Sequence, residues 1–517
     1  MPGRLEFEVK FSTNTQARQR RSDTSPMQIL LMGDFSGLND AVTGFPIHSL
    51  DVDNFDSLMT KLSPRLTLDI GAEQTQVIEL EFKSLEDFHP DSLFDRLPVF
   101  QHLRELRSKL DNPATFAQAA AELALPSTKK ETESVVDTTA TTSPATTPPT
   151  EDSAKLLDEL LGDRAAHIAT EPTAVKSRKT ADINAFIKNA IAPHIEAGPH
   201  PQRDSYIASV DLTIGDLMRS ILHHPEFQAL EAAWRGAYEC TTRLELDESL
   251  RLYLLDASKD RLKQDFQQPS ADLSASCIYQ SVVEKSVLTL GGEPWSLIAG
   301  LYTFSQRSSD IDALKALGQL AYHSGGPFIA AADPQVLGCS SLVTQADARQ
   351  WQGIAEEEQH AWNELRDQPY AHWLGLVFPR FLLRLPYGAK ADEIERFEFE
   401  EMPAGLTDVL RHDSYLWGNA ATMCAVLIGQ SYQSNGWSMG LGDVLEIGDL
   451  PWHVYESQGE KTVKPCAEVV MSESSAEAIE SHGIMPLMSY KDRNAVRLWR
   501  FRSLARQNAG LAGPWAD

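Results

Sequence analysis

The feature that most constrains the fold is a stretch rich in threonine and proline that interrupts an otherwise ordinary globular sequence. Residues 138–150 read TTATTSPATTPPT, and the low-complexity region around them runs from Leu125 to about Asp152. This composition cannot bury enough apolar surface to offset the entropy of ordering the chain, so we expect a flexible linker. A linker of about 27 residues has a mean reach of about 30 Å. The chain therefore divides into two folded parts that can dock on each other or on neighbouring molecules.

Length, charge and cysteine usage narrow the class of protein. A chain of 517 residues is too long for one hydrophobic core, which favours two or three domains. The 46 basic and 73 acidic residues give a net charge of −27, which repels nucleic-acid phosphates and anionic lipids. The sequence contains no apolar run of membrane-spanning length, and residues 1–8 do not have the apolar core of a signal peptide. The five scattered cysteines match neither a disulfide framework nor a zinc site. We therefore expect a cytoplasmic protein that neither binds nucleic acid nor inserts into a membrane.

The hydrophobic patterns of the N-terminal part alternate between strand and helix. Residues 5–11 alternate apolar and charged side chains, which predicts a half-buried strand. Residues 29–32 are wholly apolar and predict a central strand buried on both faces. Residues 77–82 predict another strand, and the spacing of apolar residues over 91–110 predicts one amphipathic helix.

The C-terminal part shows the same alternation. We expect helices over 226–239, 350–366 and 418–432, and strands over 250–255 and 373–378. Alternating helices and strands of this kind indicate an α/β fold with mixed sheets.

Two groups of motifs resemble the two subunits of one assembly. The first group resembles the small contractile-sheath subunit of type VI secretion systems (TssB/VipA-like). It comprises MQILLMGDFSG at 27–37, DVDNFD at 51–56 and FKSLEDFHPD at 82–91. The second group resembles the large sheath subunit (TssC/VipB-like). It comprises HPEFQALEAAWRG at 224–236, GGEPW at 291–295, PRFLLRLPYG at 379–388 and YLWGN at 415–419.

This resemblance implies a domain organisation and a mode of action. Residues 1–124 would form a small-subunit-like domain, 125–180 a linker with a short helix at 154–161, and 181–517 a large-subunit-like domain. Sheath subunits stack as a wall around a tube of hexameric rings, and a change of packing rather than catalysis drives the tube outward. The implied partners are other sheath subunits, the inner-tube hexamer protein, the baseplate and an AAA+ ATPase that recycles the contracted wall. No cofactor is implied.

Two segments are candidates for contacts made by such an assembly. The resemblance places an ATPase-docking helix at 154–161, although a helix that packs on its own domain explains the same pattern equally well. The apolar positions of this helix are Leu156, Leu157, Leu160 and Leu161. The strand at 5–11 is a candidate edge for strand exchange with a neighbouring subunit. Its apolar positions are Leu5, Phe7, Val9 and Phe11.

Arg380 and Arg384 form a third candidate, because they lie in the strongly apolar stretch 378–386. A buried arginine must be paired with an acidic group. The nearby candidates are Glu398, Glu400 and Glu401. We favour an internal salt bridge, and the alternative is a network that contacts a neighbouring subunit together with Lys390.

A serine hydrolase is a remote alternative. The sequence GWSMG at 436–440 has the spacing of a nucleophile elbow around Ser438, with Asp443 and either His453 or His482 downstream. Such an elbow needs a strand before the serine and a helix after it, whereas the predicted order here is the reverse. The sequence EEQH at 357–360 has metal-ligand spacing, but a second copy of this pattern is missing. We therefore expect no catalytic residue and no metal.

The chain departs from the family pattern at the end of each part. It ends at Asp517, soon after residues 484–488, without the usual C-terminal tail of the large subunit. The small-subunit-like part gives way to the linker before its last helices. Because exchanged tail strands make such walls continuous, two roles stay open. One is a structural sheath component, and the other is an accessory factor that binds sheath, baseplate or tube and regulates assembly without polymerising.

Overall fold

The computed structural model of the chain describes residues 25–37, 44–70, 76–123, 183, 186–191, 203–267, 272–341, 344–457, 459–506 and 509–515. The chain forms two compact units, which we describe separately. The larger unit comprises Met1–Ile70, Val77–Arg96 and Gly215–Asp517, and the smaller comprises Gly71–Gln76 and Leu97–Ile214. The predicted strand at 5–11, the linker at 125–180 and its helix at 154–161 lie outside the described residues.

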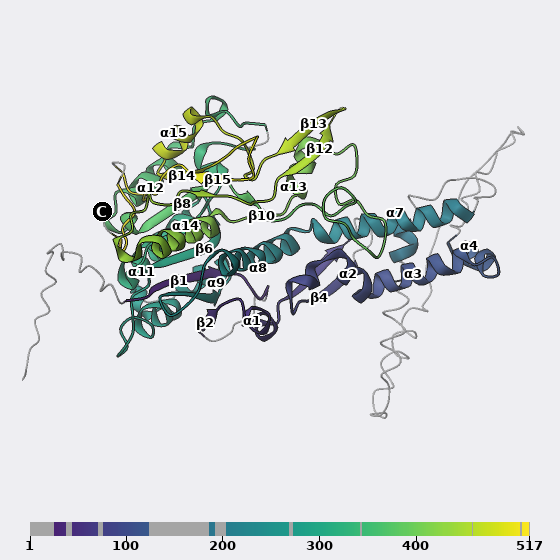
Figure 1. Cartoon of the computed structure of the whole chain (residues 1–517), viewed down its shortest axis with the longest axis horizontal. Helices are drawn as coiled ribbons and strands as arrows, with labels where there is room; N and C mark the ends of the chain where they lie inside the picture. Colours follow the sequence, from purple (N-terminus) through teal and green to yellow (C-terminus); the bar gives the residue numbers. More distant parts are fainter. Residues whose placement is uncertain are drawn as a thin grey trace, which may run out of the picture. The chain divides into compact units, whose positions relative to one another are not determined.

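Within the described part of the larger unit, a nine-stranded sheet has the order β11-β15-β14-β8-β7-β6-β1-β5-β2 (Figure 1). In that order the strands are Glu446–Ile447, Val496–Leu498, Ile484–Ser489, Leu374–Phe378, Phe328–Ala332, Leu297–Phe304, Met27–Gly33, Leu250–Asp256 and Ile47–Leu50. The strands from β14 to β5 are parallel. Antiparallel strands close the sheet on both sides, with β2 at one edge and β15 and β11 at the other.

Strand β1 is an interior strand of this sheet and comes from the N-terminal part of the chain. Ile29 pairs with Leu252 of β5 on one side and with Leu297 of β6 on the other. In Figure 1 it is the purple strand among teal ones. Every residue of β1 is buried, as a strand covered on both faces requires, which confirms the prediction for residues 29–32.

Helices cover both faces of the sheet. As a result, every residue of β1, β7 and β8 is buried. Helix α14 (Ala420–Asn435), apolar almost all round, lies against β1, β6, β7 and β8. Helix α11 (Ser308–Ser324) connects β6 to β7 and packs on β6, β7 and β8. Helix α8 (Pro225–Arg243) begins with proline at its first position, where no hydrogen-bonding N–H is needed, and packs on α14.

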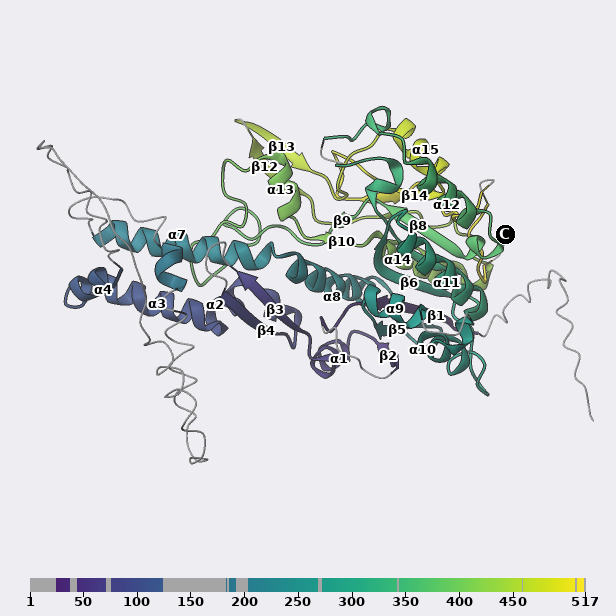
Figure 2. The same ribbon diagram turned by 180° about the vertical axis from the view of Figure 1, so that it is seen from behind.

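Shorter elements complete the larger unit. The helices are α1 (Phe55–Leu62), α2 (Pro90–Arg96), α9 (Lys259–Phe266), α10 (Cys277–Tyr279), α12 (Glu356–Arg366), α13 (Asp408–Ser414) and α15 (Glu473–Ser481). The remaining strands pair as β3 (Arg65–Ile70) with β4 (Gln76–Glu81), β9 (Phe381–Leu382) with β10 (Trp417–Gly418), and β12 (His453–Ser457) with β13 (Glu460–Lys464). Figure 2 shows these elements from behind.

The smaller unit is helical where the structure describes it. It contains α3 (Pro98–Asp111), α4 (Phe116–Leu123) and the first part of α7 (Arg203–Leu222). Arg107 of α3 donates from Nε to Asp211 Oδ1 of α7 at 2.6 Å. Phe116 of α4 and Tyr206 of α7 meet edge to face, with their ring centres 6.1 Å apart. These contacts join α7 to α3 and α4, which lie far from it in the sequence.

The structure confirms the helices predicted over 226–239 and 418–432, and the strands predicted over 77–82, 250–255 and 373–378. The single helix predicted over 91–110 is wrong, because α2 ends at Arg96 and α3 begins at Pro98. Proline has no N–H to continue a helix and pushes the residue before it to an extended conformation. Leu97 accordingly has φ −78° and ψ 129°.

The helix predicted over 350–366 is too long at its N-terminal end. Helix α12 begins only at Glu356, and residues Ala348–Gln350 form a separate 3-10 turn. Trp351, which follows that turn, is extended, with φ −73° and ψ 138°.

Candidate functional site

The first candidate site is the junction that joins β1 to the rest of the larger unit. Trp234 of α8 is fully buried and donates its indole N–H to the carbonyl of Phe35, just after β1, at 2.8 Å. Its ring also meets the rings of Phe35 and Phe55 edge to face, at centre distances of 5.3 and 5.5 Å. A buried tryptophan is stabilised by both a large apolar contact area and a partner for its N–H, and residues of the N-terminal part supply both.

Polar contacts hold both ends of β1. At its C-terminal end, Asp256 Oδ1 accepts the N–H groups of Phe35 and Ser36 at 2.7 and 3.1 Å. At its N-terminal end, the Gln28 N–H donates to Ser296 Oγ at 2.9 Å, and Gln28 Nε2 donates to Glu293 Oε2 at 2.8 Å. The strand is therefore positioned along its axis as well as paired on both sides.

A second contact joins α2 to the loop before residue 400. The Asp91 carboxylate accepts the backbone N–H groups of Glu395 and Arg396, each at 3.0 Å. Phe94 stacks on Phe397 with ring centres 4.4 Å apart. Residues of the N-terminal part thus pack within the same unit as residues beyond 215, in one and the same chain.

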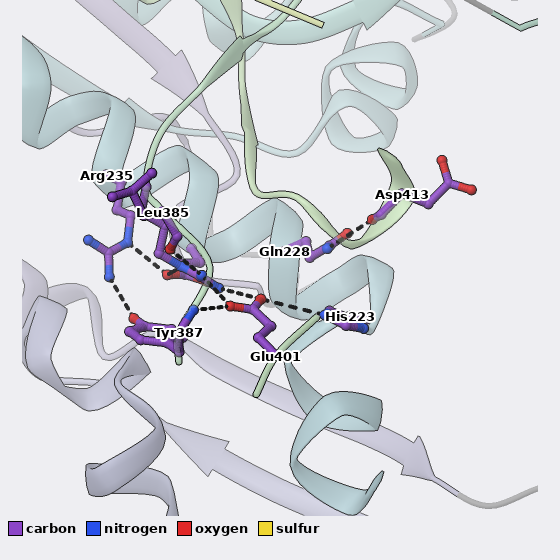
Figure 3. Close-up of polar contacts among 9 residues, drawn as sticks. His223, Gln228, Arg235, Leu385, Tyr387, Glu401 and Asp413 are labelled. Atoms are coloured by element: carbon purple, nitrogen blue, oxygen red, sulfur yellow. Dashed lines mark hydrogen bonds and ion pairs between the residues drawn. The ribbon is translucent and has the colours of Figure 1, made fainter. Parts of the chain in front are cut away.

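The second candidate site is a buried ion-pair network around Arg384 (Figure 3). Arg384 Nε lies 2.9 Å from Glu231 Oε1, and its Nη1 lies 2.8 Å from Glu401 Oε2. The guanidinium also lies over the ring of Tyr387, 4.2 Å from its centre. The side chains of Arg384, Glu231 and Glu401 are 6%, 0% and 1% exposed, so these charges interact away from water.

The network also includes Arg235, the Tyr387 hydroxyl and backbone N–H, and His223, as the dashed contacts of Figure 3 show. Arg235 pairs with Glu231 at 2.7 Å and donates to the Tyr387 hydroxyl at 3.3 Å. Glu401 accepts the N–H of Tyr387 at 2.8 Å and lies 3.5 Å from His223 Nε2. Burial raises the pKa of Glu401, but the charge of Arg384, the nearby His223 and the hydrogen bond from Arg384 outweigh it and lower this pKa to about 2. Glu401 therefore stays ionised inside the protein.

Arg380 belongs to a separate network centred on Glu468. Arg380 donates from Nε to Glu468 Oε1 at 2.9 Å and from its backbone N–H to Oε2 at 2.8 Å. His412 Nε2 lies 3.2 Å from the same carboxylate. Burial raises the pKa of Glu468, but the charge of Arg380 and these hydrogen bonds hold it well below its usual range. The two arginines, four residues apart in sequence, thus bind two different sets of acidic partners.

Comparison with known proteins identifies the family to which these sites belong. The profile of the VipB/EvpB family, described as a tail sheath N-terminal domain, matches residues 204–504, which is more than half of the chain. The chain belongs to this tail sheath family. A second profile, that of the type VI secretion system protein VipA, matches residues 4–125.

A curated relative points to the same family. The type VI secretion system sheath protein TssC1 of Pseudomonas aeruginosa is 32% identical to this chain over 295 residues. The alignment covers 56% of this chain and 58% of that protein, so the chain spans little more than half of this relative.

The predicted contact residues of this sheath-family chain fall into three groups. Arg384 and Glu401 pair inside the larger unit, as the internal salt bridge requires, whereas Arg380 pairs with Glu468 rather than with the predicted glutamates. The expected burial of Arg380 is wrong, because its side chain is 46% exposed. Lys390, Glu398 and Glu400 are exposed, and Glu400 accepts the N–H of Ala389 at 3.1 Å. Contact of these residues with another subunit stays a prediction. The candidate docking-helix leucines (Leu156, Leu157, Leu160, Leu161) and edge-strand residues (Leu5, Phe7, Val9, Phe11) lie outside the described residues.

The sequence reasoning missed Glu231 and Glu468 as partners of the two arginines. Glu231 lies on α8 among the buried side chains of Phe227, Leu230 and Trp234. A glutamate on the apolar face of a predicted helix signals a buried charge that needs a partner, so Glu231 could have been found. Glu468 follows a short hairpin and has no comparable signal.

The segment around Ser438 does not have the strand before the serine that a nucleophile elbow needs. Ser438 is exposed in a 3-10 turn that directly follows α14. Asp443 accepts hydrogen bonds from Gly440 and Asn435, each at 2.8 Å, and His453 Nδ1 lies 2.7 Å from the Tyr415 hydroxyl. Asp443 and His453 are therefore engaged elsewhere. The described residues contain neither a metal-binding group of three or more ligands nor a helix long and apolar enough to cross a membrane.

Proposed function

We propose that this chain is a non-catalytic structural subunit of a type VI secretion contractile sheath, and that one polypeptide supplies both halves of the wall unit. The observation that carries the proposal is the position of β1. This strand lies in the region that the VipA profile matches, and it pairs with β5 and β6, which lie in the region that the VipB profile matches. Removing an interior strand would expose both neighbours, so the two halves act as one folding unit.

The domain boundaries follow from this interpretation. Residues 1–124 form the small-subunit-like part, 181–517 the large-subunit-like part, and 125–180 the linker that permits their pairing in one chain. A linker raises the local concentration of one part around the other to roughly millimolar, which favours correct pairing over pairing between chains.

The subunit works through packing. A sheath stores energy when its subunits assemble and releases it when they change from one packing to another, which requires units that stay rigid. The interior strand and the ion-pair networks around the buried carboxylates of Glu401 and Glu468 supply this rigidity, because shifting either network would leave a buried carboxylate without its partner. The partners are other sheath subunits, the inner-tube hexamer protein, the baseplate and a recycling AAA+ ATPase, which would grip the segment 154–161, for which the sequence predicts a helix. All five cysteines are free, as suits a cytoplasmic location.

Negative-stain microscopy tests this proposal. The full-length protein would be imaged alone and with the sheath subunits encoded beside it. Long ribbed tubes formed by the protein alone, or tubes that incorporate it along their length, are the expected result. Discrete particles that change only the number or length of the neighbours' tubes would overturn the wall role and assign an accessory role instead.

A further inference from the structure

A pocket of about 590 Å³ opens beside α13 and the hairpin of β12 and β13. Figure 1 and Figure 2 both show α13 next to this hairpin. The pocket is lined by residues of the loop segments 386–391 and 400–405 and by residues 453–456 of β12. Arg411 of α13 also lines the pocket and is 8% exposed. A volume of this size admits a side chain with its adjoining backbone.

Arg411 differs from the two paired arginines of this region. Its guanidinium carbon lies 4.3 Å from the centre of the Tyr455 ring, but its buried Nε has no hydrogen-bond partner. No hydrogen bond or ion pair joins its guanidinium to any residue that the structure describes. Arg380 and Arg384, by contrast, each pair with a carboxylate. Stacking on a ring offsets only part of the cost of burying a charge, so Arg411 lacks the acidic partner that such a site needs.

The charged residues that line the pocket do not supply the missing acidic partner of Arg411. Glu400 and Glu456 line the pocket, but neither lies within ion-pair distance of Arg411, and Glu400 already accepts the N–H of Ala389. Lys390 is exposed beside them and adds positive charge. His453 bonds to the Tyr415 hydroxyl and is neutral at physiological pH, because burial and the charge of Arg411 lower its pKa to about 4.

We propose that this pocket receives an aspartate or glutamate side chain from a second copy of this chain, with Arg411 forming the buried ion pair. The planar fork of arginine matches a carboxylate with two parallel hydrogen bonds. The chain itself is the fitting source, because its 73 acidic residues exceed its 46 basic ones and a sheath subunit meets many copies of itself. The choice of a second copy rests on the proposed sheath function, whereas the carboxylate chemistry of the pocket does not.

The first experiment tests carboxylate binding without any assembly. Dilute full-length protein would be unfolded thermally in glutarate, an analogue of the glutamate side chain, and in chloride at equal ionic strength. Arg411→Met removes the charge and keeps the length, and Arg380→Met is the matched control in the neighbouring network. We expect glutarate to raise the Tm of the wild type and of Arg380→Met but not that of Arg411→Met.

The Tm of each variant in chloride is a second readout, and it distinguishes a ligand-binding role of Arg411 from a structural role. Arg411→Met removes an unpaired buried charge, so its Tm in chloride should equal or exceed that of the wild type. Arg380→Met leaves Glu468 without its guanidinium partner and should lower the Tm. If Arg411→Met lowers the Tm as Arg380→Met does and glutarate has no effect on the wild type, the pocket proposal is overturned.

The last experiment identifies the source of the carboxylate. Sedimentation velocity over a concentration series should show that Arg411→Met weakens self-association by about tenfold or more. A glutarate effect with unchanged self-association, or a wild type that does not self-associate, would overturn the second copy as the source. Only the latter result also counts against the sheath function, so the two failures are distinguishable.

Discussion

Replacing Arg384 with methionine tests whether the buried ion-pair network stabilises the larger unit. After this change Glu231 keeps Arg235 at 2.7 Å, but Glu401 keeps only the Tyr387 N–H and His223 at 3.5 Å. The lost stability should therefore come mainly from Glu401. Removing one partner of a buried pair costs about 3–5 kcal/mol. The charge of Arg384 also lowers the pKa of Glu401 to about 2 in the folded protein, so the ionised Glu401 contributes to stability at neutral pH.

The pH dependence of this loss has a definite sign. In the wild type the pKa of Glu401 is lowered on folding, so its contribution is fully present above pH 4.5 and is lost as pH falls through about 2. Without Arg384, burial dominates and raises the pKa of Glu401 above its ordinary value. The protonated carboxyl is then favoured in the folded state. The difference between wild type and Arg384→Met should therefore be largest near neutral pH, should begin to shrink above pH 4.5 as the pH falls through the raised pKa of the variant, and should go on shrinking down to about pH 2.

Urea unfolding followed by tryptophan fluorescence measures this difference. All 10 tryptophans lie beyond residue 215, so the signal reports on the larger unit alone. Adding Glu401→Gln to Arg384→Met should restore part of the stability, because it removes the uncompensated charge. Arg349→Met, which breaks the exposed pair with Asp347, is the control and should cause no measurable change. A loss below about 1 kcal/mol, or no recovery in the double variant, would refute the reasoning.

Three further outcomes follow from the same structure. A protease site placed within residues 138–150 and cut after folding should leave the two fragments eluting together until urea is added, because β1 is an interior strand; separation in native buffer would contradict this pairing. Trp234→Phe should lower the free energy of unfolding by about 1–3 kcal/mol, because the Phe35 carbonyl loses its donor, whereas the partly exposed Trp452→Phe should change it little in the same urea assay. Ser438→Ala should leave tube formation in negative-stain images unchanged, and loss of tubes would show that the hydroxyl has a role.

Local sequence rules predicted the interior of the elements better than their ends. The run at 29–32 and the strand at 373–378 were identified correctly, because a wholly apolar segment of strand length is stable only when both faces are covered. The helix over 91–110 was too long, because its apolar spacing continues through Pro98 while its backbone does not. Periodicity reports which face is buried, and proline decides where the hydrogen bonding stops.

The candidate site was predicted only in part, since its partners are distant in sequence. The apolar stretch around Arg384 indicated a buried arginine, and Glu401 was among the nearby acidic candidates. Glu231, which lies 153 positions away on α8, and Glu468, the partner of Arg380, enter through tertiary packing. The sequence also offered no way to predict that Arg411 is unpaired, because this depends on which carboxylates the fold brings near it.

The sequence by itself determined the family, most of the strand and helix segments and the need to pair the buried Arg384, because these depend on local composition and on motifs read along the chain. Only the tertiary structure decided that β1 lies between β5 and β6 of the same chain. A buried apolar strand is compatible with any partner of matching length, so its own residues do not choose between neighbours. That choice is made by contacts formed once the chain has folded, such as Trp234 with Phe35 and Asp256 with the end of β1.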